Sequence, residues 1–88
     1  MYVIAVYDIN EKRVNKILKL MRQYLHWQQR SVFEGELSEA KIGELMSKCN
    51  RIIKDEDTIK FYMFESVKYF RCEILGSEVR DDGLRNFI

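Results

Sequence analysis

An acidic residue, Asp8, directly follows an apolar run that extends from Tyr2 to Tyr7. A carboxylate is the kind of oxygen ligand that a hard cation such as Mg²⁺ prefers. Metal-assisted phosphodiester cleavage usually gathers several ligands and often two metals, so one carboxylate is too few. A two-fold axis near Asp8 would bring two carboxylates together, and a divalent cation would relieve their repulsion. The alternative interpretation is that Asp8 only caps the helix that follows.

Basic residues are concentrated in one segment, although the formal net charge of the 88-residue chain is only +1. Residues 12–33 include no acidic residue and six basic ones: Lys12, Arg13, Lys16, Lys19, Arg22 and Arg30. A local excess of positive charge attracts phosphates even on a nearly neutral protein. A helix face that is merely solvated is the alternative, but such a face usually carries acid–base pairs one turn apart. The segment therefore favours binding to a nucleic-acid backbone.

The elements that would position these residues follow from apolar spacing. Residues 2–7 predict a central strand that is buried on both faces. Asn10 is a good N-cap for an amphipathic helix over residues 11–25, whose basic residues lie opposite its apolar stripe. Residues 26–37 predict two short strands, or one long bent strand, with a turn near Arg30, and Ser38 predicts the cap of a second helix. Residues 58–64 predict a further strand with two largely apolar faces, and residues 70–75 a last short one.

This order predicts an α+β fold, a ferredoxin-like β-α-β-β-α-β sandwich with an extra C-terminal strand. We expect one domain over residues 1–76 and a C-terminal tail over residues 77–88. Two helices would cover one face of the sheet, and the aromatic side chains of the other face would need a cover of their own. A homodimer would provide it, with the strand near Cys72–Ile74 pairing with the other subunit.

Several classes of protein are disfavoured by the sequence. No stretch reaches the roughly 18 uncharged apolar residues of a membrane span, so we expect a soluble, cytoplasmic protein without membrane contacts. Zinc binding is disfavoured because the two cysteines are far apart and His26 is the single histidine. Cys49 falls on an apolar helix face and is expected to be a buried thiol. RNA-recognition domains carry a basic consensus where this chain has Glu34 and Glu36.

Three segments of the chain resemble one known family. The start, Met1 to Ile9, and the stretch Lys12 to Ile17 are similar to the first strand and first helix of the CRISPR-associated protein two family. The most specific match is the run from Gln29 to Gly35, which reads Gln-Arg-Ser-Val-Phe-Glu-Gly. The resemblance covers approximately residues 1–75.

The resemblance implies a ferredoxin-like homodimer that works with the larger CRISPR integrase subunit when new spacers are captured from foreign DNA. It also implies a metal-dependent endonuclease that acts on duplex DNA or single-stranded RNA, with Mg²⁺ or another divalent cation as cofactor. By this resemblance, Asp8 would be the metal ligand and a catalytic residue, and Tyr7 the second catalytic residue. The nucleic-acid-binding residues would be Lys12, Arg13, Lys16, Lys19, Arg30 and Phe33.

From the residues alone, Tyr7 and Phe33 fit strand packing equally well. The chain departs from the family at Trp27-Gln28, where many members carry an arginine, and at Leu25-His26, where many have a glycine. Two rival functions stay open at this point. One is a free-standing ribonuclease of the toxin type on the same fold. The other is a non-catalytic ferredoxin-like structural dimer, which would show no salt-dependent binding of nucleic acid.

Overall fold

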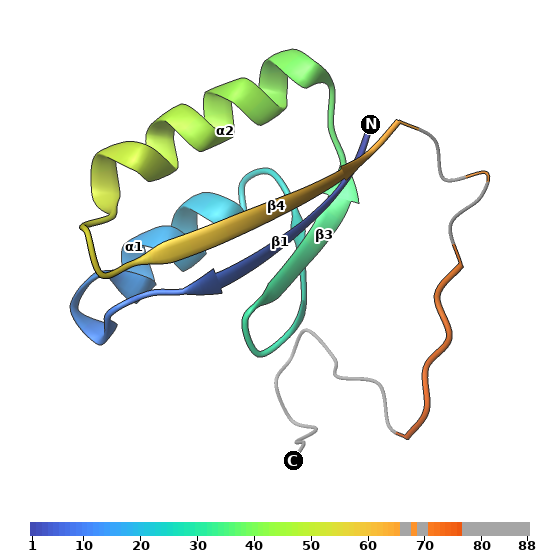
Figure 1. The fold of residues 1–88 in the computed structure, drawn as a ribbon, viewed down its shortest axis with the longest axis horizontal. Coiled ribbons are helices and arrows are strands. Elements are labelled where there is room, and N and C mark those ends of the chain that lie inside the picture. The colour runs from blue at the N-terminus through green and yellow to red at the C-terminus, as the bar shows by residue number, and fades with distance from the viewer. Residues whose placement is uncertain (66–67, 69–70, 77–88) are drawn as a thin grey trace.

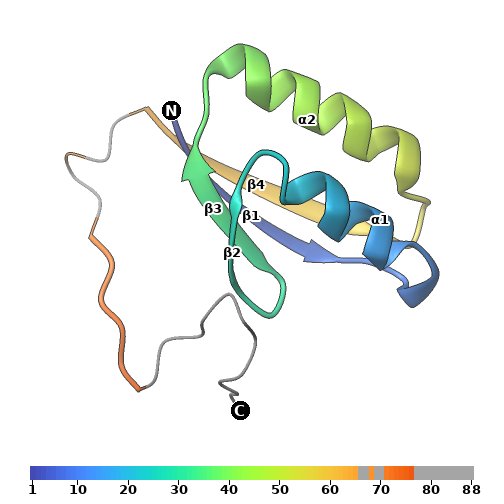
Figure 2. The same ribbon diagram turned by 180° about the vertical axis from the view of Figure 1, so that it is seen from behind.

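The computed structural model describes residues 1–65, 68 and 71–76. Its elements, in chain order, are β1 (Tyr2–Asp8), α1 (Glu11–Met21), β2 (His26–Gln29), β3 (Val32–Glu36), α2 (Glu39–Ile52) and β4 (Thr58–Phe64). The four strands form one antiparallel sheet in the order β2-β3-β1-β4. Both helices lie on the same face of this sheet (Figures 1 and 2). The predicted ferredoxin-like α+β arrangement is therefore confirmed.

The central strand β1 pairs with both β3 and β4 and contributes the middle of the apolar core. Its alternate residues Val3, Ala5 and Tyr7 are buried on the face that the helices cover. The register sets Ala5 opposite Phe33 of β3 on one side and Phe61 of β4 on the other. Because directly opposed residues share a face, these side chains lie in the same apolar layer, which packs against α1 and α2.

Both helices begin at the predicted caps. The Asn10 side chain accepts a hydrogen bond from the Lys12 amide at 2.8 Å, and Ser38 accepts one from the Lys41 amide at 3.2 Å. Helix α1 ends at Met21, four residues before the predicted end at residue 25. Leu25 is still buried, as its apolar position predicted, but it sits in the turn that brings the chain into β2. An apolar residue can thus continue the stripe without continuing the helix.

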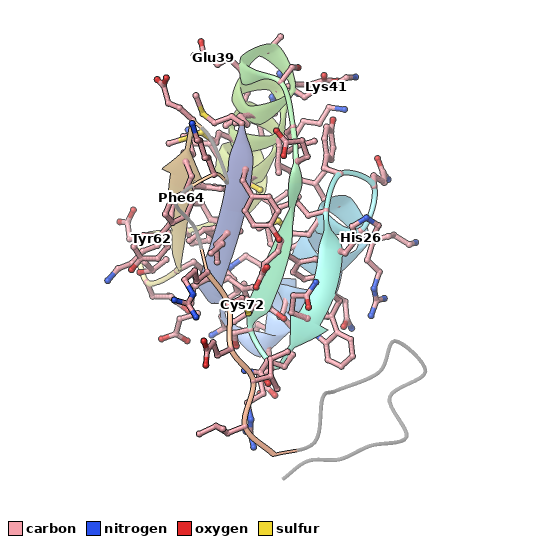
Figure 3. The ribbon with its side chains drawn as sticks, turned by 90° about the vertical axis from the view of Figure 1, so that its right-hand side faces the viewer. His26, Glu39, Lys41, Tyr62, Phe64 and Cys72 are labelled. Atoms are coloured by element: carbon pink, nitrogen blue, oxygen red, sulfur yellow. The ribbon has the colours of Figure 1, made fainter. Side chains whose placement is uncertain are left out.

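The second face of the sheet is open in the single chain. It carries Tyr2, Ile4 and Val6 of β1, which the register sets opposite residues of β3 and β4. Tyr62 of β4 is 49% exposed on this face. The segment around Cys72 passes the sheet on the side away from the helices (Figure 3). An apolar, half-exposed sheet face of this kind needs a cover.

The predicted C-terminal strand is not formed in the single chain. Residues 71–75 carry no strand, and residue 70 lies outside the described residues. A strand forms only where a neighbouring strand offers free backbone hydrogen-bonding groups. This segment runs past the open face of the sheet instead of along one of its edges (Figure 3). Its pairing with a second subunit stays a prediction. The predicted tail over 77–88 also lies outside the described residues, so the domain boundary at residue 76 stays a prediction.

Two further features concern the described residues. No helix among them has the length and the apolar composition that crossing a membrane requires. Cys49 is a buried free thiol on α2, as predicted, and its burial raises its pKa to about 11. The thiolate is the reactive form of cysteine, so Cys49 is held in its inert form at neutral pH.

Candidate functional site at the end of the central strand

Asp8 is exposed at the last position of β1. Strand alternation places it on the same side as Ile4 and Val6, which is the open face of the sheet. It does not cap α1, because that role belongs to Asn10. The interpretation of Asp8 as a helix cap is therefore wrong, and its carboxylate is held at a fixed point facing the open side.

Two connections flank Asp8. On one side Asp8 is paired with Thr58, the first residue of β4, so the connection from α2 to β4 ends beside it. On the other side Val6 is paired with Val32, the first residue of β3, so the turn from β2 to β3 ends there. We call residues 53–57 the acidic loop and residues 30–31 the arginine turn.

The acidic loop is joined to α1 by Arg13. The Arg13 guanidinium donates from Nε to Asp57 Oδ2 at 2.6 Å and from Nη2 to Glu56 Oε2 at 2.9 Å. Asp57 also accepts from the backbone amides of Asn10 and Lys54, both at 2.9 Å. The adjacent Arg13 holds the pKa of the Asp57 carboxyl well below its usual range. The Arg13 guanidinium is therefore engaged within the chain, and its predicted contact with nucleic acid stays a prediction.

The arginine turn is held by two aromatic side chains. The Tyr7 hydroxyl donates to the backbone carbonyl of Arg30 at 2.9 Å, and Trp27 Nε1 donates to the same oxygen at 3.0 Å. The Tyr7 amide donates to the carbonyl of Ser31 at 3.1 Å. Burial raises the pKa of Tyr7, and its side chain lies below the surface. The predicted catalytic role of Tyr7 is untested, but its hydroxyl faces this turn.

Phe33 lies under Tyr7, with the two ring centroids 6.1 Å apart. Its exposed fraction is 0%, which places it among the largest fully buried side chains. An aromatic ring can stack on a base only if a face of the ring is accessible. In this structure Phe33 is a core residue that supports Tyr7, and its predicted contact with nucleic acid stays a prediction.

The other predicted phosphate-binding residues are exposed. Lys12, Lys16 and Lys19 lie on the outer side of α1, and Arg30 is exposed on the arginine turn. Within residues 1–65, 68 and 71–76 no ion pair of the three lysines occurs. The structure adds Arg22, which lines a cavity of about 320 Å³ with Leu25, His26 and Trp27. Arg22 belongs to the segment without acidic residues, but the sequence gave no reason to include it among the predicted binding residues.

The carboxylates near Asp8 determine whether the described residues of one chain could bind a divalent cation. Among the described residues no three His, Cys, Asp or Glu side chains gather as a metal site. The nearby Asp57 carboxylate already accepts from Arg13 on both oxygens. The described part of the chain therefore gathers no set of three ligands around Asp8.

Comparison with known proteins agrees with this architecture. The family described as CRISPR associated protein Cas2 matches residues 1–72. CRISPR-associated endoribonuclease Cas2 of Thermotoga maritima is 54% identical over 94% of this chain and 97% of its own length. The protein of the same name from Dictyoglomus turgidum is 48% identical over 89% of this chain and 91% of its own.

Solved structures give the same result. A crystal structure of a Cas2 protein superimposes with a TM-score of 0.82 at 43% identity, covering 100% of this chain and 98% of its own. Streptococcus pyogenes Cas2 superimposes with a TM-score of 0.74 at 31% identity, covering 86% of this chain and 100% of its own. The resemblance carried by the first strand and the Gln29–Gly35 run is confirmed. The chain belongs to the CRISPR-associated Cas2 family.

Proposed function

We propose that this chain is a nucleic-acid-binding subunit of CRISPR adaptation that is also a cation-dependent phosphodiester endonuclease. The observation that carries the proposal is the exposed Asp8 carboxylate, fixed by the central strand on the open face of the sheet. The relatives from Thermotoga maritima and Dictyoglomus turgidum are named endoribonucleases, which supports the nuclease part. The protein would act in the cytoplasm, where the CRISPR array and the integrase subunit are located.

The exposed basic side chains would bind the backbone of the nucleic acid. Lys12, Lys16 and Lys19 are spaced at three and four residues, so they follow one side of α1. Lysine side chains that meet phosphates fix position without reading bases. Duplex DNA and single-stranded RNA would both be accepted by such a surface, and the integrase subunit would bind the same complex.

A second copy of the chain would complete the site. The half-exposed Tyr62 and its neighbours on the open face are the surface that a two-fold partner would cover, and Asp8 lies on that same side. An obligate homodimer should bury roughly 2,000 Å² or more in total. Sedimentation at micromolar concentration should give about twice the 10.6 kDa chain mass. A monomer at that concentration would contradict both the dimer and the paired carboxylates.

Mg²⁺ or another divalent cation held by the two Asp8 carboxylates would polarise a phosphate of the bound strand. The protein itself contributes the rigid placement of Asp8 and the basic residues that hold the strand on either side. Replacing Asp8 by Asn removes the negative charge that would hold the cation and preserves the size of the side chain.

The decisive experiment compares the wild type with Asp8→Asn on labelled duplex DNA and single-stranded RNA, with Mg²⁺ and with a chelator. We expect the variant to lose cleavage of both substrates and to bind them within about twofold of the wild type. Asp55→Asn is the matched control, since Asp55 is an exposed aspartate of the acidic loop and not a residue of β1. Cleavage by Asp8→Asn at the wild-type rate would show that the nuclease site lies elsewhere.

The same experiment separates the rival functions. The name endoribonuclease borne by the relatives favours RNA as the better cleaved substrate. Rapid RNA cleavage without stable duplex binding would instead favour a free-standing ribonuclease. Absence of both cleavage and salt-dependent binding would identify a structural dimer.

A further inference from the structure

The arginine turn has an unusual backbone. Arg30 has a φ of 39°, which makes it the one non-glycine residue with a positive φ among the described residues. L side chains avoid this left-handed region, and glycine or asparagine usually occupies it. A residue persists there only when the surrounding structure fixes it. Glycine would adopt this conformation more easily, so an exposed arginine at this position directs attention to its side chain.

Two donors hold this strained residue in place. A carbonyl oxygen has two lone pairs, and the Arg30 carbonyl accepts from both Tyr7 Oη and Trp27 Nε1. The two donors come from different strands, β1 and β2, so the turn is fixed from both sides. Tyr7 is in turn packed on the fully buried Phe33. The carbonyl of Arg30 is therefore connected to the rigid core through Tyr7.

We propose that Tyr7 and Trp27 are positioning residues that clamp the carbonyl of Arg30, so that the Arg30 side chain is directed at a phosphate of the bound nucleic acid. The inference rests on the proposed binding of nucleic acid and deepens it. A side chain on a fixed backbone loses less freedom on binding than one on a mobile loop. Tyr7 thus acts through Arg30 and not on the reacting phosphate.

The position of the turn supports this role. Arg30 lies beside the end of β1, where Asp8 is, and Trp27, which donates to the Arg30 carbonyl, also lines the cavity that includes Arg22. Tyr7 is buried, and the Arg30 carbonyl is the hydrogen-bond acceptor of its hydroxyl among the described contacts. A phosphate held by Arg30 would lie on the opposite side of Asp8 from the acidic loop, which would repel it.

A double-mutant cycle tests the clamp. Duplex affinity is measured by fluorescence anisotropy at several salt concentrations for the wild type, Tyr7→Phe, Arg30→Ala and the double variant. Arg30→Ala should weaken binding about tenfold and reduce the slope of log affinity against log salt by about 0.9, the value for one phosphate on duplex DNA. Tyr7→Phe, which deletes one hydrogen bond, should weaken binding about threefold. In the Arg30→Ala background, the loss of the Tyr7 hydroxyl should have an effect below about 1.5-fold.

Trp27→Phe provides an independent cycle should Tyr7→Phe fold poorly. Tyr24→Phe is the matched control, because the Tyr24 hydroxyl bonds Lys48 on α2 and not the turn. Trp27 is also the single tryptophan of the chain, so its emission reports on the turn. Arg30→Ala retains the carbonyl and should leave the emission of the free protein unchanged.

The outcomes separate the clamp from the proposed function. Tyr7→Phe could weaken duplex binding equally in the wild-type and Arg30→Ala backgrounds, or Arg30→Ala could keep the wild-type salt slope. Either result would overturn the clamp and leave the proposed binding by the lysines of α1 unaffected. A wild type without salt-dependent binding would overturn the proposed function itself.

Discussion

The two connections that flank Asp8 are built on opposite electrostatic principles. The acidic loop presents carboxylates, and an arginine from α1 neutralises them from inside the molecule. The arginine turn presents a cation, and neutral aromatic donors hold it through its backbone. In the first, the arginine side chain contacts the carboxylates of the loop, whereas in the second the aromatic donors contact the backbone carbonyl of an exposed arginine. Two arginines of the same basic segment thus have different uses.

The difference decides which basic residues can bind phosphate. The Arg13 side chain is 17% exposed and lies against Asp57, whose side chain is 0% exposed. Withdrawing Arg13 to meet a phosphate would leave a buried carboxylate without its partner, which is unfavourable. The lysines of α1 carry no such penalty, because they form no ion pair with the described residues. Nucleic-acid affinity should therefore come from the outer side of α1 and the arginine turn, and stability from the acidic loop.

The largest expected effect concerns the lysines. Replacing Lys12, Lys16 and Lys19 together by Ala should lower the magnitude of the salt slope of duplex binding by about 2.7 if each neutralises one phosphate. Arg13→Gln should leave that slope unchanged, although it removes a charge from the same helix. Binding measured over a range of salt concentrations checks both. A slope that falls for Arg13→Gln and not for the triple variant would reverse the proposed division between the two regions.

A smaller effect is expected for stability. Asp57→Ala deletes the acceptor of four hydrogen-bond donors, two of them on Arg13, and should lower the midpoint of thermal unfolding by about 10 °C. The control is Glu44→Ala on α2, whose exposed pairs with Lys41 and Lys48 predict a change below about 2 °C. Thermal unfolding followed by circular dichroism measures both. Similar changes in the two variants would mean that the acidic loop does not hold α1.

The smallest effect is a pH dependence of that stability. Arg13 holds the pKa of the Asp57 carboxyl below its unfolded value of about 4, so the stabilisation is complete above that pH and is lost as the pH falls toward the folded pKa. The difference in unfolding midpoint between wild type and Asp57→Asn should therefore be constant from about pH 7 to 5 and shrink below about pH 4. A difference that grows with acidification would show that Asp57 is not the stabilised carboxylate.

Patterns among residues that are close in the sequence were sufficient to predict most of the secondary structure and the family of this protein. The six elements follow from apolar spacing, and the caps Asn10 and Ser38 follow from local hydrogen bonding, which depends on residues only two or three positions away. The position of Asp8 follows from the end of one strand. The family follows from a short run of residues, Gln29 to Gly35, that the sequence displays directly.

The tertiary structure alone decided how the individual side chains are used. Arg13 and Asp57 are 44 residues apart and meet because the strand order brings the start of β4 beside the end of β1. The same order buries Phe33 and directs the Tyr7 hydroxyl at the Arg30 carbonyl, 23 residues away. Charge and aromatic character are properties of a residue in the sequence, but a partner or an exposed surface is a property of its neighbours in space. For this reason the basic segment could be recognised from the sequence, and its division into structural and exposed residues could not.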